Sequence, residues 1–114
     1  MNLQYGECSA ELAEASARGV GIWSPPGIDL KDDLDDLAAL TCALDLVIGP
    51  PNATTNIAAA CGAKVWMIAP PGAWTQLGTG RFPWYPTVRA FIAPALNAWP
   101  EVMAEIAKAL VSEF

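Results

Sequence analysis

Histidine is absent from this chain of 114 residues. Its absence excludes Ser-His-Asp and Cys-His catalysis, and it excludes metal sites that are built on imidazole. Basic residues are also scarce, because six lysines and arginines are set against twelve acidic residues, for a net charge of −6. The six are scattered along the chain and form no basic stripe that could neutralise phosphates. Binding to nucleic acid is therefore not expected, and binding to anionic membrane surfaces is disfavoured.

The sequence has no long apolar run, and we expect no secretory leader. Charges or prolines interrupt every apolar stretch well short of a membrane span. The N-terminal residues lack the basic and apolar regions of a signal peptide. The three cysteines, Cys8, Cys42 and Cys61, are far apart and form no CxxC motif. We therefore expect reduced, buried thiols and a cytoplasmic protein with no membrane span.

The composition, 54% hydrophobic and 16% charged, is typical of one folded domain, which we expect to cover residues 1–114. Short apolar segments alternate with helical patterns, so the sequence predicts an α/β fold with a mainly parallel five-stranded sheet and helices on both faces. The expected strands are Asn2–Tyr5, Val20–Trp23, Asp45–Ile48, Lys64–Ala69 and Val88–Ile92, and the expected helices are Ser9–Arg18, Asp32–Leu44, Ala53–Cys61 and Trp99–Phe114.

A candidate binding site lies where the apolar strand at Asp45–Ile48 leads through a short loop into the next helix. Asn52, Thr54 and Thr55 begin that helix. The first backbone N–H groups of a helix have no partner within the helix, and they can hold an anion such as phosphate. The alternative is an ordinary helix cap, because asparagine and threonine are common there.

Two other clusters have a structural and a functional interpretation. The acidic run Asp32, Asp33, Asp35 and Asp36 resembles a metal site, but these spacings point the carboxylates in several directions, so we expect a solvated helix start and no metal. The second cluster contains Trp74, Pro83, Trp84 and Tyr85. It could form a stacking wall for a ligand ring, or it could pack in the core or an interface.

Four segments, read in order, resemble one protein family. They are LQYGE with ELA, DLKDDLDDLAALTCALDLVIG, NATTNIAAACGAKVWMIAP and RFPWYPTVRAF. This order is similar to the C-terminal domain of bacterial glycosyltransferases linked to tetratricopeptide repeats, which are related to the heptosyltransferases and the O-linked N-acetylglucosamine transferases. The resemblance implies a GT-B fold, in which this chain would be the three-layer, Rossmann-like half that binds a nucleotide-sugar donor.

The resemblance also implies roles for particular residues. Gln4 and Gly6 would contact the nucleotide, and Asn52, Thr54, Thr55 and Asn56 would form the donor loop. Proline at 51, alanine at 53 and asparagine at 56 replace the acid, serine and histidine of the family's loop, so donor binding should be weak. No catalytic residue, metal or cofactor is expected, and the isolated chain should not catalyse transfer. The alternatives are a non-catalytic interaction or scaffold domain that has lost the donor site, or a flavodoxin-like domain for another small ligand.

The same resemblance bears on partners. The family has a further strand before the segment that matches Asn2–Gly6, in the centre of the sheet. We therefore expect Asn2–Tyr5 to pair directly with Asp45–Ile48, and we expect a homodimer to cover the surface that the missing segment leaves bare. If the chain is a fragment, an acceptor domain or a tetratricopeptide-repeat domain would precede it.

Overall fold

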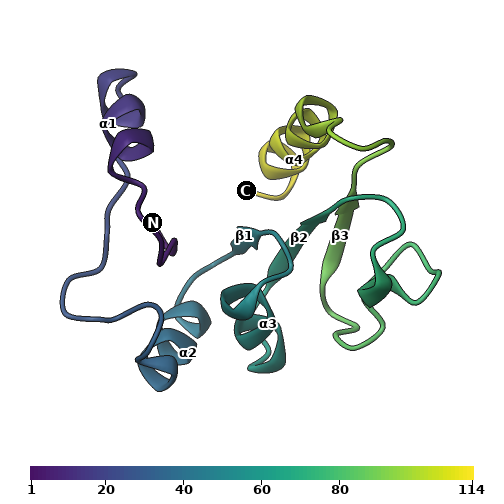
Figure 1. Ribbon diagram of the computed structural model, residues 1–114, viewed down its shortest axis with the longest axis horizontal. Coiled ribbons are helices and arrows are strands. Elements are labelled where there is room, and N and C mark those ends of the chain that lie inside the picture. The colour runs from purple at the N-terminus through teal and green to yellow at the C-terminus, as the bar shows by residue number, and fades with distance from the viewer. The chain divides into compact units, whose positions relative to one another are not determined.

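The computed structural model describes all 114 residues, in two compact units (Figure 1). The N-terminal unit comprises Met1–Leu40 and the C-terminal unit Thr41–Phe114. Charge is divided unevenly between them. Eight acidic and two basic residues give the N-terminal unit all of the net −6, whereas four of each leave the C-terminal unit neutral. No helix is long and apolar enough to cross a membrane.

The N-terminal unit contains the helix α1, Ser9–Ala17, and most of α2, Leu34–Cys42, which continues into the C-terminal unit. No residue of α1 is buried. Ser9 is the first residue of this helix, and its backbone N–H donates to the Glu7 carboxylate at 2.7 Å. Hydrogen bonds from Ser9 lower the pKa of Glu7 below its ordinary value. The helix start is therefore held by an acidic side chain.

The two strands expected in this unit are not formed. Asn2–Tyr5 and Val20–Trp23 are joined by one backbone hydrogen bond, from the Asn2 N–H to the Trp23 carbonyl at 2.8 Å, without a ladder. Tyr5, Val20 and Trp23 are exposed, so these segments have no core face to bury. Gly21 further weakens the second segment, because glycine within a strand has no side chain to pack.

The C-terminal unit is built on a parallel sheet of three strands, β1 (Val47–Gly49), β2 (Val65–Ala69) and β3 (Arg89–Ile92), in the order β1-β2-β3 (Figure 1). The prediction of a five-stranded, Rossmann-like half of a GT-B fold is therefore wrong. The pairing expected between Asn2–Tyr5 and Asp45–Ile48 is also wrong, since β1 pairs with β2 and the sheet takes no strand from the N-terminal unit.

One face of the sheet packs against α3, Ala53–Ala60. Val47 and Val65 are paired in register and both are buried. Gly49 points to the same face, where an added Cβ would lie 3.0 Å from Cγ2 of Thr55. The small residues of α3 and this glycine therefore let the helix lie close to the sheet.

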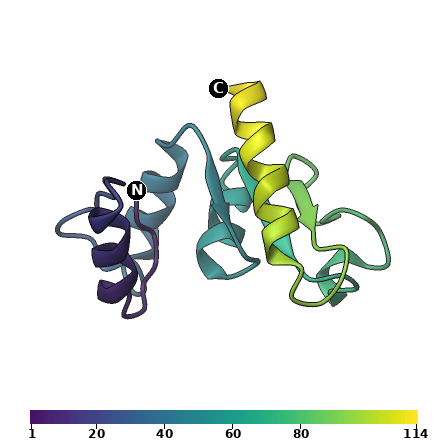
Figure 2. The same ribbon diagram turned by 90° about the horizontal axis from the view of Figure 1, so that it is seen from above.

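The opposite face packs against α4, Trp99–Glu113, drawn in yellow in Figure 2. Trp66 and Phe91 stack there with ring centroids 5.1 Å apart, beneath Val102 and Ile106 of the helix. Trp66 is only 1% exposed. These large side chains form the core that fixes α4 on the sheet.

Glu113, near the end of α4, forms ion pairs with two basic residues, Lys64, which immediately precedes β2, and Arg89 of β3. Its Oε2 accepts from Lys64 Nζ at 2.9 Å, and its Oε1 is paired with Arg89. The hydrogen bond from Lys64 is the largest cause that lowers the pKa of Glu113 below its ordinary value of 4.5. All three side chains are partly exposed, so we expect a modest contribution that salt weakens.

Stability should therefore depend on pH through Glu113. Because folding lowers its pKa, the stabilisation is complete above the unfolded pKa and is lost as pH falls through the folded pKa. We expect Glu113→Gln to lower the melting temperature near pH 7, and the difference from the wild type to vanish in acid. Thermal melts of both proteins from pH 7 to pH 2 measure this, with Glu105→Gln as the control. A difference that persists at the lowest pH would contradict the assignment.

The cysteines are less buried than the sequence suggests. All three are free thiols, but Cys8 is only half-buried, and Cys42 and Cys61 are exposed. The prediction of buried thiols is therefore wrong for Cys42 and Cys61. Both lie at the ends of helices, Cys42 as the last residue of α2 and Cys61 as the C-cap of α3, where side chains reach the surface.

Candidate functional site: an aromatic pocket beside α3

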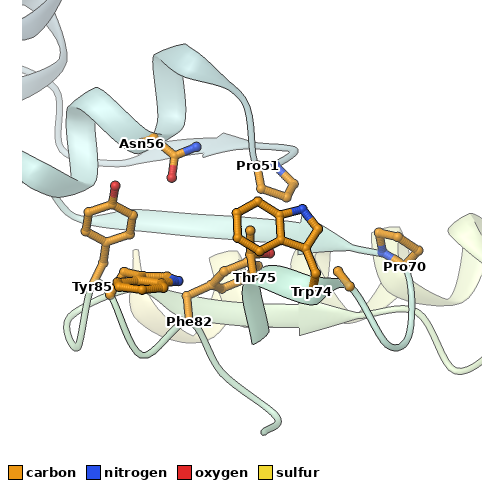
Figure 3. A pocket seen from close by; sticks show the side chains of 9 residues that line it. Pro51, Asn56, Pro70, Trp74, Thr75, Phe82 and Tyr85 are labelled. Atoms are coloured by element: carbon orange, nitrogen blue, oxygen red, sulfur yellow. The ribbon is translucent and has the colours of Figure 1, made fainter. Parts of the chain in front are cut away.

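A cavity of about 450 Å³ opens in the C-terminal unit, between the start of α3 and the long loop that follows β2. This is the edge at which parallel strands end, a common position for ligands in α/β folds. We call it the aromatic pocket. Its lining residues are Pro51, Asn56, Pro70, Ala73, Trp74, Thr75, Phe82, Trp84 and Tyr85 (Figure 3).

The loop after β2 forms the aromatic side of the pocket. A short 3-10 helix, Trp74–Gln76, carries Trp74, which is 79% exposed. Gln76 is buried, and its Nε2 donates to the Pro70 carbonyl at 3.1 Å. Thr79 Oγ1 donates to the Gln76 carbonyl at 2.7 Å. These bonds brace the loop from within, so Trp74 is exposed on a supported backbone rather than on a loose one.

The start of α3 forms the other side. Asn52 caps the helix: its side-chain oxygen accepts from Thr55 N at 3.1 Å, and its own N–H donates to Thr55 Oγ1 at 3.1 Å. Asn56 Nδ2 donates to the Asn52 carbonyl at 2.7 Å. Asn56 and Pro51 project from this side toward the cavity, opposite Trp74 and Tyr85 (Figure 3).

The pocket is rich in unused hydrogen-bond donors. The indole N–H groups of Trp74 and Trp84 and the hydroxyl of Tyr85 make no hydrogen bond within the chain, and Trp84 is 60% exposed. On the other side, one N–H of Asn56 Nδ2 donates to the Asn52 carbonyl, which leaves the second N–H as a donor and the side-chain oxygen as an acceptor. The lining contains no Asp, Glu, Lys, Arg or Cys. Such a pocket recognises a ligand by stacking and by donating hydrogen bonds.

The residues predicted to form a binding site belong to both units of the chain. Asn52, Thr54, Thr55 and Asn56 lie together at the start of α3, but only Asn56 lines the pocket. Asn52 and Thr55 form the capping box, and Thr54 is 4% exposed with no partner for its Oγ1.

Gln4 and Gly6 lie in the N-terminal unit. They are near each other, because a Cβ added at Gly6 would lie 3.5 Å from Gln4 Nε2. Gln4 lines a second, open cavity of about 350 Å³ with the neighbouring residues Met1, Asn2, Leu3, Cys8, Glu11, Leu12 and Ile22.

The aromatic cluster for which the sequence left stacking or packing open lies mostly around this cavity. Trp74, Trp84 and Tyr85 do line one cavity, whereas Pro83 is not among the lining residues. Pro70 and Phe82 were missed as lining residues. The available signal was the density of prolines and aromatic residues between Pro70 and Pro86, which is unusual for a loop.

Comparison with known proteins gives one informative similarity. Protein FlbA of Caulobacter vibrioides is 51% identical to this chain over 111 residues, which are 96% of the chain and 19% of that protein. The chain thus spans about a fifth of the length of this relative. No family model matches the chain, and no solved structure matches it.

These findings correct the predicted function. The relative bears the name Protein FlbA, which does not describe a glycosyltransferase, and the sheet has three strands where half of a GT-B fold has more. The resemblance to tetratricopeptide-linked glycosyltransferases, and the nucleotide-sugar donor function implied by it, are therefore wrong. The short motifs on which it depended, such as NATTN, serve here to cap α3.

Proposed function

We propose that this chain is a non-catalytic interaction module, and that its aromatic pocket binds an extended, proline-containing peptide of a partner. The observation that carries this proposal is the set of unpaired donors on aromatic rings: Trp74, Trp84 and Tyr85. On the opposite side of the pocket, Pro51 contributes a proline ring and Asn56 contributes a side-chain amide oxygen.

A polyproline II peptide complements such a pocket. It has no internal hydrogen bonds, so its carbonyl groups are free to accept, and its prolines have no N–H that would need an acceptor. Proline rings also pack well on aromatic faces, and the peptide loses little entropy on binding because it is already extended. The pocket offers donors and ring faces, and it has few acceptors. The two chemistries therefore match.

The charge around the pocket limits the choice of peptide. No acidic residue occurs between Leu46 and Pro100, and Arg81 immediately precedes the lining residue Phe82. Arg81 is exposed, and its guanidinium forms no ion pair. A neutral or acidic peptide is accordingly favoured over a basic one.

Removal of one indole from the pocket should weaken peptide binding. The test uses the whole chain and a blocked ten-residue oligoproline, with binding measured by calorimetry. We expect Trp84→Ala to lower the affinity by about tenfold or more, the range found for aromatic residues at the centre of interfaces. Trp99→Ala is the matched control, since Trp99 is also partly exposed but does not line the pocket.

Two results would overturn the proposal. One is equal binding of oligoproline and of a glycine-serine peptide of the same length. The other is an equal loss of affinity in the Trp84→Ala and Trp99→Ala variants. Circular dichroism of each variant confirms that it is folded before binding is measured.

We further propose that the 114 residues act as one module and that its partners include a tetratricopeptide-repeat domain or a second copy. We also propose that the module works in the cytoplasm, and its three free thiols support this location. Exposed apolar residues on α4, Met103 and Val111, support a second copy. Light scattering over a dilution series measures this, and a monomer at tens of micromolar would refute the dimer.

A further inference from the structure

Two of the three cysteines lie next to each other in the C-terminal unit. The Sγ of Cys42 lies 3.7 Å from the backbone carbonyl oxygen of Cys61. Both side chains are exposed, and neither sulfur is in a disulfide. The two cysteines lie at the C-terminal ends of two helices: Cys42 is the last residue of α2, and Cys61 caps the C-terminus of α3.

From this arrangement we infer that Cys42 and Cys61 are a site of reversible oxidation, at which a peroxide converts the two thiols to an intrachain disulfide. The thiolate of one cysteine attacks a peroxide oxygen, the O–O bond breaks, and a sulfenic acid and water form. The second thiol then attacks that sulfur, the S–O bond breaks, and a second water leaves. Two electrons pass from the sulfurs to the peroxide, and a dithiol reductant reverses the change.

The local geometry supports a bond between these two residues. A disulfide needs Cβ atoms roughly 3.5–4.5 Å apart, and backbones that cannot approach rule it out. Here the sulfur of Cys42 already touches the backbone of Cys61, so the helix ends are close before any reaction. Because both side chains are exposed, each can change its χ1 rotamer without displacing core atoms.

Cys8 differs from this pair in its unit, its burial and its hydrogen bonding. It lies in the N-terminal unit, it is half-buried, and its Sγ accepts a weak hydrogen bond from Asn2 Nδ2 at 3.6 Å. No cysteine is close to it in that unit, because Cys42 and Cys61 both belong to the other unit. Cys8 therefore serves as the internal reference thiol for the other two.

The disulfide would act on α2. This helix begins in the N-terminal unit and ends at Cys42 in the C-terminal unit. A bond to Cys61 would tie its last turn to the end of α3 and would close the chain between positions 42 and 61. Such a cross-link restricts the unfolded chain and so raises stability. Oxidation would thus fix the end of α2 to the end of α3 within the C-terminal unit, whereas reduction would release it.

The experiment oxidises the dilute whole chain with hydrogen peroxide and counts thiols after denaturation. We expect one free thiol to remain, on Cys8, together with a mass loss of two hydrogens. A non-reduced peptide map should show Cys42 joined to Cys61, and the melting temperature should rise by several degrees and fall again with dithiothreitol. Cys8→Ser should give the same cross-link and no remaining thiol, and Cys42→Ser should give neither the cross-link nor the rise.

The inference fails if three thiols survive, if Cys8 enters the linkage, or if the only disulfides join different chains. It also fails if both exposed cysteines gain oxygen, as sulfinic or sulfonic acids, without becoming joined. Because the readout is chemical, none of these outcomes depends on the peptide-binding function proposed above.

Discussion

Replacement of Trp66 by alanine is expected to lower the free energy of unfolding by about 3–5 kcal/mol, the usual cost of removing a large aromatic side chain from a core. Trp66, the second residue of β2, is 1% exposed, and its ring is in contact with Phe91 and Phe114. Lys64 and Arg89 also lie over the ring, with the Arg89 guanidinium carbon 5.1 Å from its centroid. The variant would therefore lose the packing of α4 and two cation–π contacts together.

Chemical denaturation, followed by the circular dichroism of the helices, measures this loss. Lys108→Ala is the control on α4, because Lys108 is exposed and its truncation should change stability by less than about 0.5 kcal/mol. Trp66→Phe should recover part of the loss, since it restores an aromatic ring of smaller size. A loss at Trp66→Ala no larger than that of Lys108→Ala would show that α4 is not held by this face of the sheet.

Local patterns predicted the helices and the central strand well. The continuous apolar run at Val65–Ala69 indicated a strand covered on both faces, and in β2 four of five residues are buried. The first two expected strands were wrong because a short apolar segment becomes a strand only when a neighbour and a covering helix are present. Asn2–Tyr5 and Val20–Trp23 have one backbone bond between them and no covered face.

The candidate site could be predicted only in part. The aromatic residues after Pro70 were visible in the sequence, and their abundance in a loop was a valid signal. Their meeting with Pro51 and Asn56 was not visible, because it depends on the register of β1 and β2, which brings two separate loops to one edge of the sheet. The contact between Cys42 and Cys61 was not visible in the sequence either, because it depends on how the ends of α2 and α3 meet in the fold.

The threonines at the start of α3 show that residue type alone does not determine the hydrogen bonding of a side chain. Both Thr54 and Thr55 were predicted to contact a ligand. The Thr55 hydroxyl donates to the Pro50 carbonyl at 2.6 Å and accepts from the Asn52 N–H at 3.1 Å, so it completes the helix start. Thr54 is buried beside it, and its hydroxyl has no partner. The two hydroxyls should therefore contribute to the free energy of unfolding with opposite signs. The sequence alone does not show this difference.

Valine substitutions at these two positions should consequently change stability in opposite directions. Valine keeps the shape of threonine and removes the hydroxyl. At Thr54 the change removes a buried, unpaired polar group, so we expect the free energy of unfolding to rise by about 1 kcal/mol. At Thr55 the change leaves a backbone carbonyl and an N–H without their partner and breaks the capping box, so we expect a loss of about 1–3 kcal/mol.

Urea denaturation of Thr54→Val and Thr55→Val under the same conditions tests both expectations, and each variant is the matched control for the other. The comparison is sharp because the two substitutions are chemically identical and one residue apart, so differences in helix propensity between threonine and valine largely cancel. The free energies of unfolding of the two variants should therefore differ by about 2–4 kcal/mol if the two effects add. This difference reports the hydrogen bonding of the two hydroxyls. Equal effects at the two positions would mean that the Thr55 hydroxyl does not hold the start of α3.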